Sequence, residues 1–201
     1  MSCTPSAVHL IERTAACLCE AFGASVAALA SALRNEQEPA HALGAAVDAI
    51  LLQLQLRQAA WGPASHPLDL LQLMALARGL PGHVAVDASA LPPATLFSAA
   101  AGRVVLNILL LAADSLSQGG QIILAGAAED LFIRIAGPQA AWPVGMTLCL
   151  ASEAEARSAL TDERSLQMAL TALFAYAADI RLSALLPAVT HAEPAILRFG
   201  R

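Results

Sequence analysis

Histidine and cysteine are the residue types of this chain that could carry nucleophilic, acid–base or metal chemistry. The chain holds His9, His41, His66, His83, His191, Cys3, Cys17, Cys19 and Cys149. Cys17 and Cys19 would point about 200° apart on a helix, so they cannot bind one metal ion together. No histidine pair at zinc-ligand spacing lies near them. The sequence therefore predicts no metal site, and reduced thiols in a cytosolic protein.

Familiar catalytic motifs are missing. The sequence contains no P-loop, no G-x-S-x-G and no histidine–carboxylate metal cluster. Its 201 residues are 57% hydrophobic but only 4% aromatic and 13% charged, which predicts a folded chain with a sizeable core. The net charge is −5 and the 11 basic residues are spread along the chain, which argues against nucleic acid or an anionic membrane surface as partner.

The mean hydropathy of +0.61 raises the question of a membrane span. The most apolar stretch, residues 104–113, reads VVLNILLLAA and is about half the roughly 20 residues needed to cross a bilayer. Arg103 and Asp114 flank it, so the sequence predicts a buried core helix instead. The first 20 residues carry two glutamates and no basic segment typical of a signal peptide, so a cytoplasmic location is expected.

Two long helices are predicted before residue 62. Over residues 6–34 the apolar residues recur every three or four positions, which indicates one long helix. The run NEQEPAH interrupts this pattern, and its Pro39 can occupy the first turn of a second helix over residues 41–60. The sequence WGP at 61–63 ends that helix. A short connection between two such helices predicts an antiparallel hairpin.

A lone two-helix hairpin cannot bury its own apolar seam. Both predicted helices are apolar over more than one face. A second copy of the chain would solve this, because two hairpins can pack as a four-helix bundle. The sequence thus predicts a homodimer formed through residues 1–62.

A second domain is predicted over residues 68–201, after a proline-containing linker at 63–67. Helices are expected at 68–80, 94–116, around 143–151 and at 162–178. Strands are expected at 83–87, 121–125, 131–136, 181–186 and 194–199, with a hairpin turn at 128–130. This order predicts an α+β sandwich, in which helices cover one face of one sheet.

Several short stretches carry a resemblance to a known family. They read LCEAF at 18–22, QLQLR at 53–57 followed by AWG at 60–62, VLNILLL at 105–111, QGG at 118–120, SLQ at 165–167 and IRL at 180–182. In this order the chain resembles the ChpT-like histidine phosphotransferases of alphaproteobacteria. The resemblance implies a dimerising helical hairpin followed by a degenerate domain similar to the ATPase domain of histidine kinases.

The same resemblance places a glutamate at the family's phospho-acceptor position. LCEAF is similar to a leucine-cysteine-histidine-aspartate motif, so Glu20 stands for the histidine and Ala21 for the acid. A carboxylate there cannot form a stable phosphohistidine, and its charge repels an incoming aspartyl phosphate. His9 lies eleven residues earlier, about 20° away around the helix, and is the alternative acceptor.

The implied partners are receiver domains of response regulators or hybrid kinases. A docking face on the first helix would comprise Glu12, Arg13, Glu20, Ala21 and Ala24. In this interpretation the protein is a pseudo-phosphotransferase, which binds such partners without relaying phosphate. Whether it has any enzymatic activity stays open, because the acceptor histidine is replaced.

The ATPase-like domain is expected to hold at most a degenerate nucleotide site, at Asn107 and Gly137, and no cofactor. Residues 135–138 read IAGP where kinases have an aspartate before glycine, and no second glycine motif follows. Asn107 is equally well explained as an amide satisfied inside its own helix. The alternative function is an enzyme or small-ligand binder in which Asn107 contacts the ligand. A structural dimer without any ligand is a third possibility.

Overall fold

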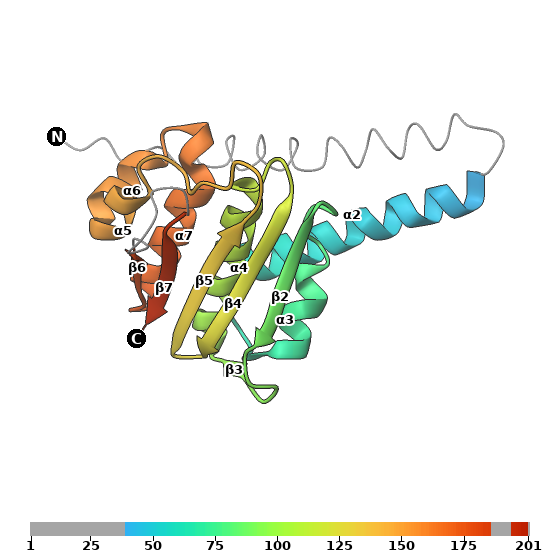
Figure 1. Ribbon diagram of the computed structural model, residues 1–201, viewed down its shortest axis with the longest axis horizontal. Coiled ribbons are helices and arrows are strands. Elements are labelled where there is room, and N and C mark those ends of the chain that lie inside the picture. The colour runs from blue at the N-terminus through green and yellow to red at the C-terminus, as the bar shows by residue number, and fades with distance from the viewer. Residues whose placement is uncertain (1–38, 186–193, 201) are drawn as a thin grey trace.

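The computed structural model describes residues 39–185 and 194–200 (Figure 1). Its helices are α2 Pro39–Trp61, α3 Leu70–Ala77, α4 Ala99–Asp114, α5 Met146–Ala151, α6 Glu153–Ala159 and α7 Leu166–Ala177, with a 3-10 turn, η1, at Glu163–Ser165. Its strands are β1 Leu68–Asp69, β2 Val84–Ala90, β3 Leu96–Phe97, β4 Gly120–Ala127, β5 Asp130–Ala136, β6 Arg181–Leu185 and β7 Ile196–Gly200. The prediction of a mixed α+β fold is confirmed.

Helix α2 confirms the second of the two predicted helices. It begins at Pro39, two residues before the predicted start at 41, and ends at Trp61, one residue after the predicted end at 60. Its last turn is closed by a hydrogen bond from the Gly62 N–H to the Gln58 carbonyl (2.9 Å). The N-terminal part of α2 extends away from the sheet and the other helices (Figure 1). The first predicted helix lies outside the described residues, so the hairpin and its four-helix bundle stay predictions.

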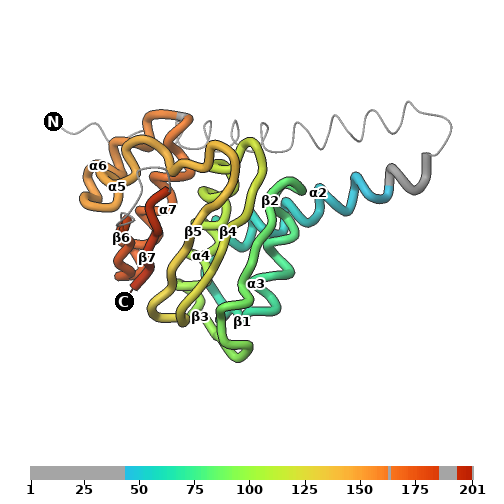
Figure 2. The backbone as a smooth tube through the Cα atoms, in the orientation of Figure 1, coloured from blue at the N-terminus to red at the C-terminus, as the bar shows by residue number. Residues whose placement is uncertain are grey.

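The main sheet has five strands in the order β2-β4-β5-β7-β6. Strands β2 and β4 are parallel, and the other neighbours are antiparallel. All five are the strands that the sequence predicts, and β4 and β5 form the expected hairpin through a turn at Ala128 and Glu129. The tube in Figure 2 shows this sheet as a single twisted layer.

Alternation along the strands gives the sheet one inward face. In β5, Leu131, Ile133 and Ile135 are buried, whereas Arg134 between them is exposed. The buried side chains face helices α4 and α7, which lie behind the sheet in Figure 1. The hydrophobic core therefore sits between this sheet face and a layer led by α4, in which twelve of the sixteen residues are buried.

Two predicted helices begin later than expected. Leu68 and Asp69 pair with Phe97 and Leu96 as the two-stranded sheet β1–β3, so neither segment starts as a helix. Helix α3 then begins at Leu70. Its N-cap is Asp69, whose side chain accepts a hydrogen bond from the Gln72 N–H (2.7 Å) in a capping box. Helix α4 begins at its own cap, Ser98. The caps, and not the apolar pattern, decide where these helices start.

The region before β6 also differs from the expectation. Helix α6 was not predicted; Ser152 caps it and an Arg157–Glu153 ion pair (2.6 Å) spans one of its turns. The helix expected over 162–178 begins as the 3-10 turn η1, and regular α-helix starts only at Leu166. Among the described residues, no helix combines the length and the apolar character that crossing a membrane would need.

Candidate functional site

The predicted phospho-acceptor position and docking face lie outside the described residues. This applies to Glu20, to the alternative acceptor His9, and to Glu12, Arg13, Ala21 and Ala24. The roles given to them by the resemblance stay predictions. Two predicted site residues, Asn107 and Gly137, are described, and they test what the second domain can offer a ligand.

Asn107 lies in the middle of α4 and its side chain is fully buried. Its Nδ2 donates hydrogen bonds to the carbonyls of Ala60 (2.6 Å) and Arg103 (2.9 Å). Its Oδ1 accepts one from Nε2 of Gln167 (3.1 Å). The side chain thus connects the last turn of α2, through α4, to the first turn of α7.

Gln167 and Thr171 complete this buried polar network from α7. Nε2 of Gln167 lies 3.2 Å from the Asn107 carbonyl, and the Thr171 hydroxyl lies 3.3 Å from the same oxygen. The Thr171 hydroxyl also donates to the Gln167 carbonyl (2.7 Å). A buried amide without such partners would be strongly destabilising, so the network explains why a polar residue sits inside so apolar a helix.

Gly137 follows β5 at a place where two backbones nearly touch. A Cβ atom on this glycine would lie 2.5 Å from the Gly119 carbonyl oxygen and 3.0 Å from the Gly120 Cα. Gly119 itself has a φ of +84°, and its N–H bonds to the Leu116 carbonyl (2.8 Å) as the chain turns from α4 into β4. The three glycines therefore allow close packing of this turn against the end of β5.

Both side-chain amide hydrogens of Asn107 are used inside the protein. At Gly137 the absence of a side chain allows the close backbone packing described above. The degenerate nucleotide site stays a prediction. The hydrogen bond to the Arg103 carbonyl fits the interpretation of an amide satisfied inside its own helix. The bonds to Ala60 and Gln167 reach other helices, and sequence reasoning missed Gln167 and Thr171. Their spacing of four within an apolar helix is a signal that could have indicated a shared buried face.

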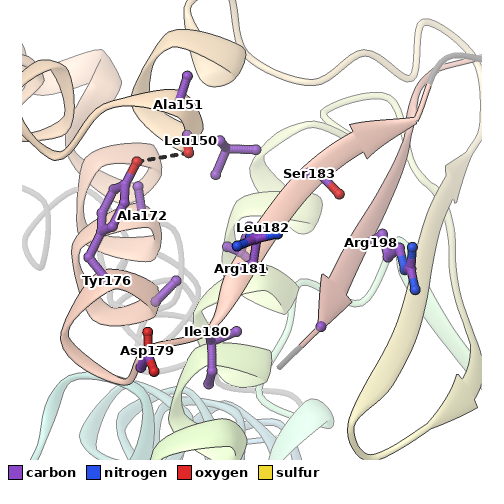
Figure 3. Close-up of a pocket in the computed structure, with 12 residues that line it drawn as sticks. Leu150, Ala151, Ala172, Tyr176, Asp179, Ile180, Arg181, Leu182, Ser183 and Arg198 are labelled. Atoms are coloured by element: carbon purple, nitrogen blue, oxygen red, sulfur yellow. Dashed lines mark hydrogen bonds between the residues drawn. The ribbon is translucent and has the colours of Figure 1, made fainter.

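A cavity of about 690 Å³ lies between α5, α7 and the edge strand β6 (Figure 3). Tyr176 borders it and donates its hydroxyl to the Leu150 carbonyl (2.8 Å). Burial raises the pKa of this phenol, and Glu153 and Cys149 add to the effect. Asp179, Arg181 and Arg198 supply the charged groups of its lining.

The residues that line this cavity include no histidine or cysteine for nucleophilic or metal chemistry. No group of three metal-binding side chains occurs in the part of the chain that is described. Nearby Cys149 is buried, and burial raises the pKa of its thiol, which keeps it protonated and unreactive at neutral pH. The described lining of this cavity therefore contains neither a thiol nor an imidazole.

Arg198 is already engaged on the open side of the sheet. Its guanidinium makes a two-pronged ion pair with Asp130 on β5, at 2.7 and 3.1 Å, and lies 5.7 Å from the centre of the Phe132 ring. The Arg198 hydrogen bonds lower the pKa of the Asp130 carboxyl. This pair ties β5 to β7 across the face that α4 and α7 leave uncovered.

The projecting part of α2 carries large apolar side chains that are partly exposed. Val47, Leu51 and Leu54 are 40%, 49% and 44% exposed. Their spacings of four and three place them on one face of the helix. Farther along, Leu56 and Ala60 are completely buried in the core. One end of α2 is therefore built into the second domain, and the other presents an apolar stripe, defined here as Val47, Leu51 and Leu54.

Comparison with known proteins gives a likeness in fold. No family model and no curated protein matches the chain. A solved structure described as that of a bacterial phosphotransferase is similar to it, with a TM-score of 0.68 and 19% sequence identity. The alignment covers 98% of each chain. At this identity the likeness shows a shared, phosphotransferase-like fold over nearly the whole length.

Proposed function

We propose that this chain is a histidine-phosphotransferase-type protein of two-component signalling that docks receiver domains without relaying phosphate. The observation that carries the proposal is the likeness in fold to a bacterial phosphotransferase, which extends over 98% of both chains. The resemblance of the sequence motifs to ChpT-like proteins supports the same assignment independently of the fold. In this proposal residues 1–62 form the dimerising hairpin and 68–201 a degenerate ATPase-like domain.

The apolar stripe of α2 supports the dimeric bundle. Three large apolar side chains, each at least 40% exposed, follow one face of a helix that extends away from the domain. Exposed apolar stripes of this kind are typical of surfaces that pack against another helix. A second copy of the hairpin would cover them and would place two docking faces on one bundle.

The loss of phosphate relay rests on the chemistry of Glu20. An acyl phosphate on a glutamate hydrolyses readily and is not the imidazole phosphate that a relay passes on. The negative charge of Glu20 also opposes the approach of a phosphorylated receiver. His9 is the alternative phosphate acceptor, because on the predicted first helix it would lie on the same face as Glu20.

The buried network around Asn107 supports a binding role in place of ATP-dependent catalysis. To contact Asn107, a nucleotide would have to displace the hydrogen bonds that Asn107 makes to α2 and α7. The buried groups that Asn107 now pairs with would then be left without hydrogen bonds, which is unfavourable. We therefore expect ATP with magnesium to leave the melting temperature unchanged. If ATP did bind, a concentration of about 100 times its Kd would raise the free energy of unfolding by roughly 2.7 kcal/mol, and the melting temperature would rise with it. A clear increase would favour the alternative, a nucleotide-binding enzyme.

The direct test uses the full-length protein and a panel of receiver domains, each phosphorylated with radiolabelled phosphate. We expect at least one receiver to bind, measured by biolayer interferometry, and no label to appear on the wild-type protein. The variant Glu20→His should accept label from the receiver that binds. Glu12→His, which places a histidine elsewhere on the predicted docking face, is the matched control and should stay unlabelled.

Two results would contradict the proposal in different ways. Label on the wild-type protein that disappears in His9→Ala would show an active phosphotransferase with a relocated acceptor. Absence of binding to every receiver in the panel, with a correctly folded dimer, would remove the signalling function itself.

A further inference from the structure

The edge strand β6 forms one wall of the cavity of about 690 Å³ that lies between it and the helices α5 and α7 (Figure 3). We call this the β6 cavity. The first three residues of the strand, 181–183, all line it. Successive side chains of a strand point to opposite faces of a sheet, so a cavity that touches all three must lie along the edge of the strand.

The backbone of β6 is paired on one side. The strand pairs with β7, and within the described ranges it has no second neighbouring strand. Its N–H and C=O groups make no further hydrogen bond to the backbone of other described residues. Every other residue of an edge strand directs its N–H and C=O away from the sheet. These groups are therefore available as donors and acceptors for an added strand.

Strand β6 lacks two features that commonly prevent an edge strand from pairing. Its five residues, RLSAL, contain no proline, and their register with β7 shows no bulge. The opposite edge strand, β2, differs, because its pairing with β4 shifts register between Asp87 and Ala90. Of the two edges of the main sheet, the β6 edge is therefore the one better suited to accept a further strand.

The two sides of the β6 edge differ in chemistry. On the side of the helices, the cavity is lined by apolar side chains such as Leu150 and Leu182. On the open face of the sheet, it is lined by Arg181, Ser183 and Arg198, and Ser183 lies opposite Arg198 in the strand register. The side chains of a strand added along this edge would alternate between an apolar and a polar environment.

Arg181 supplies the charge that favours an acidic partner. Its side chain is exposed, and it makes no ion pair with a described residue. The other arginine of the lining, Arg198, is already paired with Asp130. The one carboxylate of the lining, Asp179, precedes β6 and lies at the end of the cavity (Figure 3). A carboxylate placed directly opposite Arg181 would form a stabilising cross-strand pair of opposite charges.

We propose that the edge of β6 binds an extended acidic peptide segment as a sixth strand of the main sheet. The peptide backbone pairs with that of β6. Alternate side chains, which are apolar, face α5 and α7, and the others, with a carboxylate opposite Arg181, lie on the open face. Main-chain pairing then supplies affinity, and the alternation supplies selectivity. Peptides test this inference without any receiver domain, so failure of receiver docking leaves it unaffected.

Titration of the full-length, isotopically labelled protein with end-blocked hexapeptides tests the inference. A peptide of alternating valine and glutamate should shift the backbone amides of Leu182, Ser183 and Ala184 saturably in NMR spectra. It should also slow hydrogen exchange of those β6 amides that point away from β7. The same peptide with every backbone nitrogen methylated cannot donate hydrogen bonds to β6 and should not bind. A peptide of alternating valine and lysine should bind about fivefold more weakly or less, because like charges would then face each other at Arg181.

Variants separate the charge from the space. Arg181→Gln should weaken binding of the glutamate peptide about two- to fivefold, which corresponds to the loss of one cross-strand ion pair. Arg134→Gln, at an exposed position of β5 outside the cavity lining, is the matched control and should bind like the wild type. Ala151→Trp fills the cavity from an exposed position on α5 and should abolish binding while the protein stays folded. Its control is Ala154→Trp, at an exposed position of α6 outside the lining, which should bind normally.

The inference is overturned if the glutamate peptide produces no saturable shift in β6, or if the methylated peptide or the Ala151→Trp variant gives the same binding. Equal affinity for the lysine peptide would contradict the acidic character of the partner. Slow exchange of the outward β6 amides in the protein without peptide would show that another part of the chain, or a second copy, already pairs with this edge. That result would also overturn the inference.

Discussion

Asn107 holds the three helices α2, α4 and α7 together through its side-chain hydrogen bonds. In a kinase-like domain, an asparagine in this helix would be expected to contact the nucleotide. The sequence indicated a polar residue inside an apolar helix, and that part could be predicted from local pattern alone. Its partners could not, because Ala60 and Gln167 lie 47 and 60 residues away along the chain. Only the packing of α2 and α7 on α4 brings these groups together.

Replacing Asn107 with alanine tests this structural role. Asn107→Ala would remove the side-chain donor to the buried Ala60 carbonyl and one of the acceptors of the Gln167 amide, so we expect the free energy of unfolding to fall by about 1–3 kcal/mol. Urea denaturation followed by circular dichroism measures it. The control Gln55→Ala, at an exposed position of α2, should change it by no more than about 0.5 kcal/mol. Equal effects of the two variants would show that the network contributes nothing.

The ion pair between Asp130 and Arg198 predicts a specific dependence of stability on pH. Hydrogen bonds from Arg198 hold the pKa of Asp130 below its ordinary value of 3.8. A carboxyl with a lowered folded-state pKa stabilises the fold above its unfolded value and loses that contribution as the pH falls through the folded value. Asp130→Asn should therefore be less stable than the wild type at pH 6, and the difference should shrink as the pH falls below 3.8 toward the lower pKa of the folded state.

The matched background for that measurement is Arg198→Gln, in which the carboxyl has lost its partner. There, Asp130→Asn should produce little difference between pH 6 and acid conditions. A pH-dependent difference that persists without Arg198 would show that some other group lowers the pKa of Asp130.

The helices and strands that could be predicted are those whose apolar pattern can be recognised within their own sequence. The strands of the main sheet alternate or form apolar runs, and the long helices α2 and α4 carry extended apolar patterns, so all of them were predicted. The two-residue strands β1 and β3 are too short for any period, and they form only because segments distant in sequence pair. Helix α6, with the sequence EAEARSA, has no apolar stripe to detect.

The apolar stripe on α2 gives the prediction that belongs to this scale. Leu51→Glu combined with Leu54→Glu would place charges in the proposed helix–helix interface, so we expect the dimer to dissociate to monomers. Light scattering coupled to gel filtration measures the mass. Leu71→Glu is the control: Leu71 is 81% exposed on α3, outside the stripe, and its substitution should leave the dimer intact. A monomeric wild type, or a double variant that stays dimeric, would contradict the interface.

The hydrophobic core of the second domain includes residues that come before the predicted domain boundary at residue 62. Leu56 and Ala60 are completely buried, and the Ala60 carbonyl is a partner of Asn107. Gly79 lies so close to α2 that a Cβ there would be 2.3 Å from the Leu52 carbonyl oxygen. The last turns of α2 thus serve two roles, since they continue the predicted hairpin and complete the core of the second domain.

A pair of truncations distinguishes these roles. A fragment of residues 50–201 keeps Leu56, Ala60 and the acceptor for Asn107, whereas a fragment of residues 68–201 loses all three. Removing a buried leucine alone costs about 2–5 kcal/mol, and the unpaired Asn107 amide adds to that loss. We therefore expect the shorter fragment to unfold at much lower urea concentration, or to fail to fold, while the longer one unfolds cooperatively. Equal stability would mean that α2 merely rests on the domain, and that the orientation of the predicted hairpin is free to change relative to the sheet. A large difference would mean that the stability of the core and the placement of the hairpin are set by the same few residues.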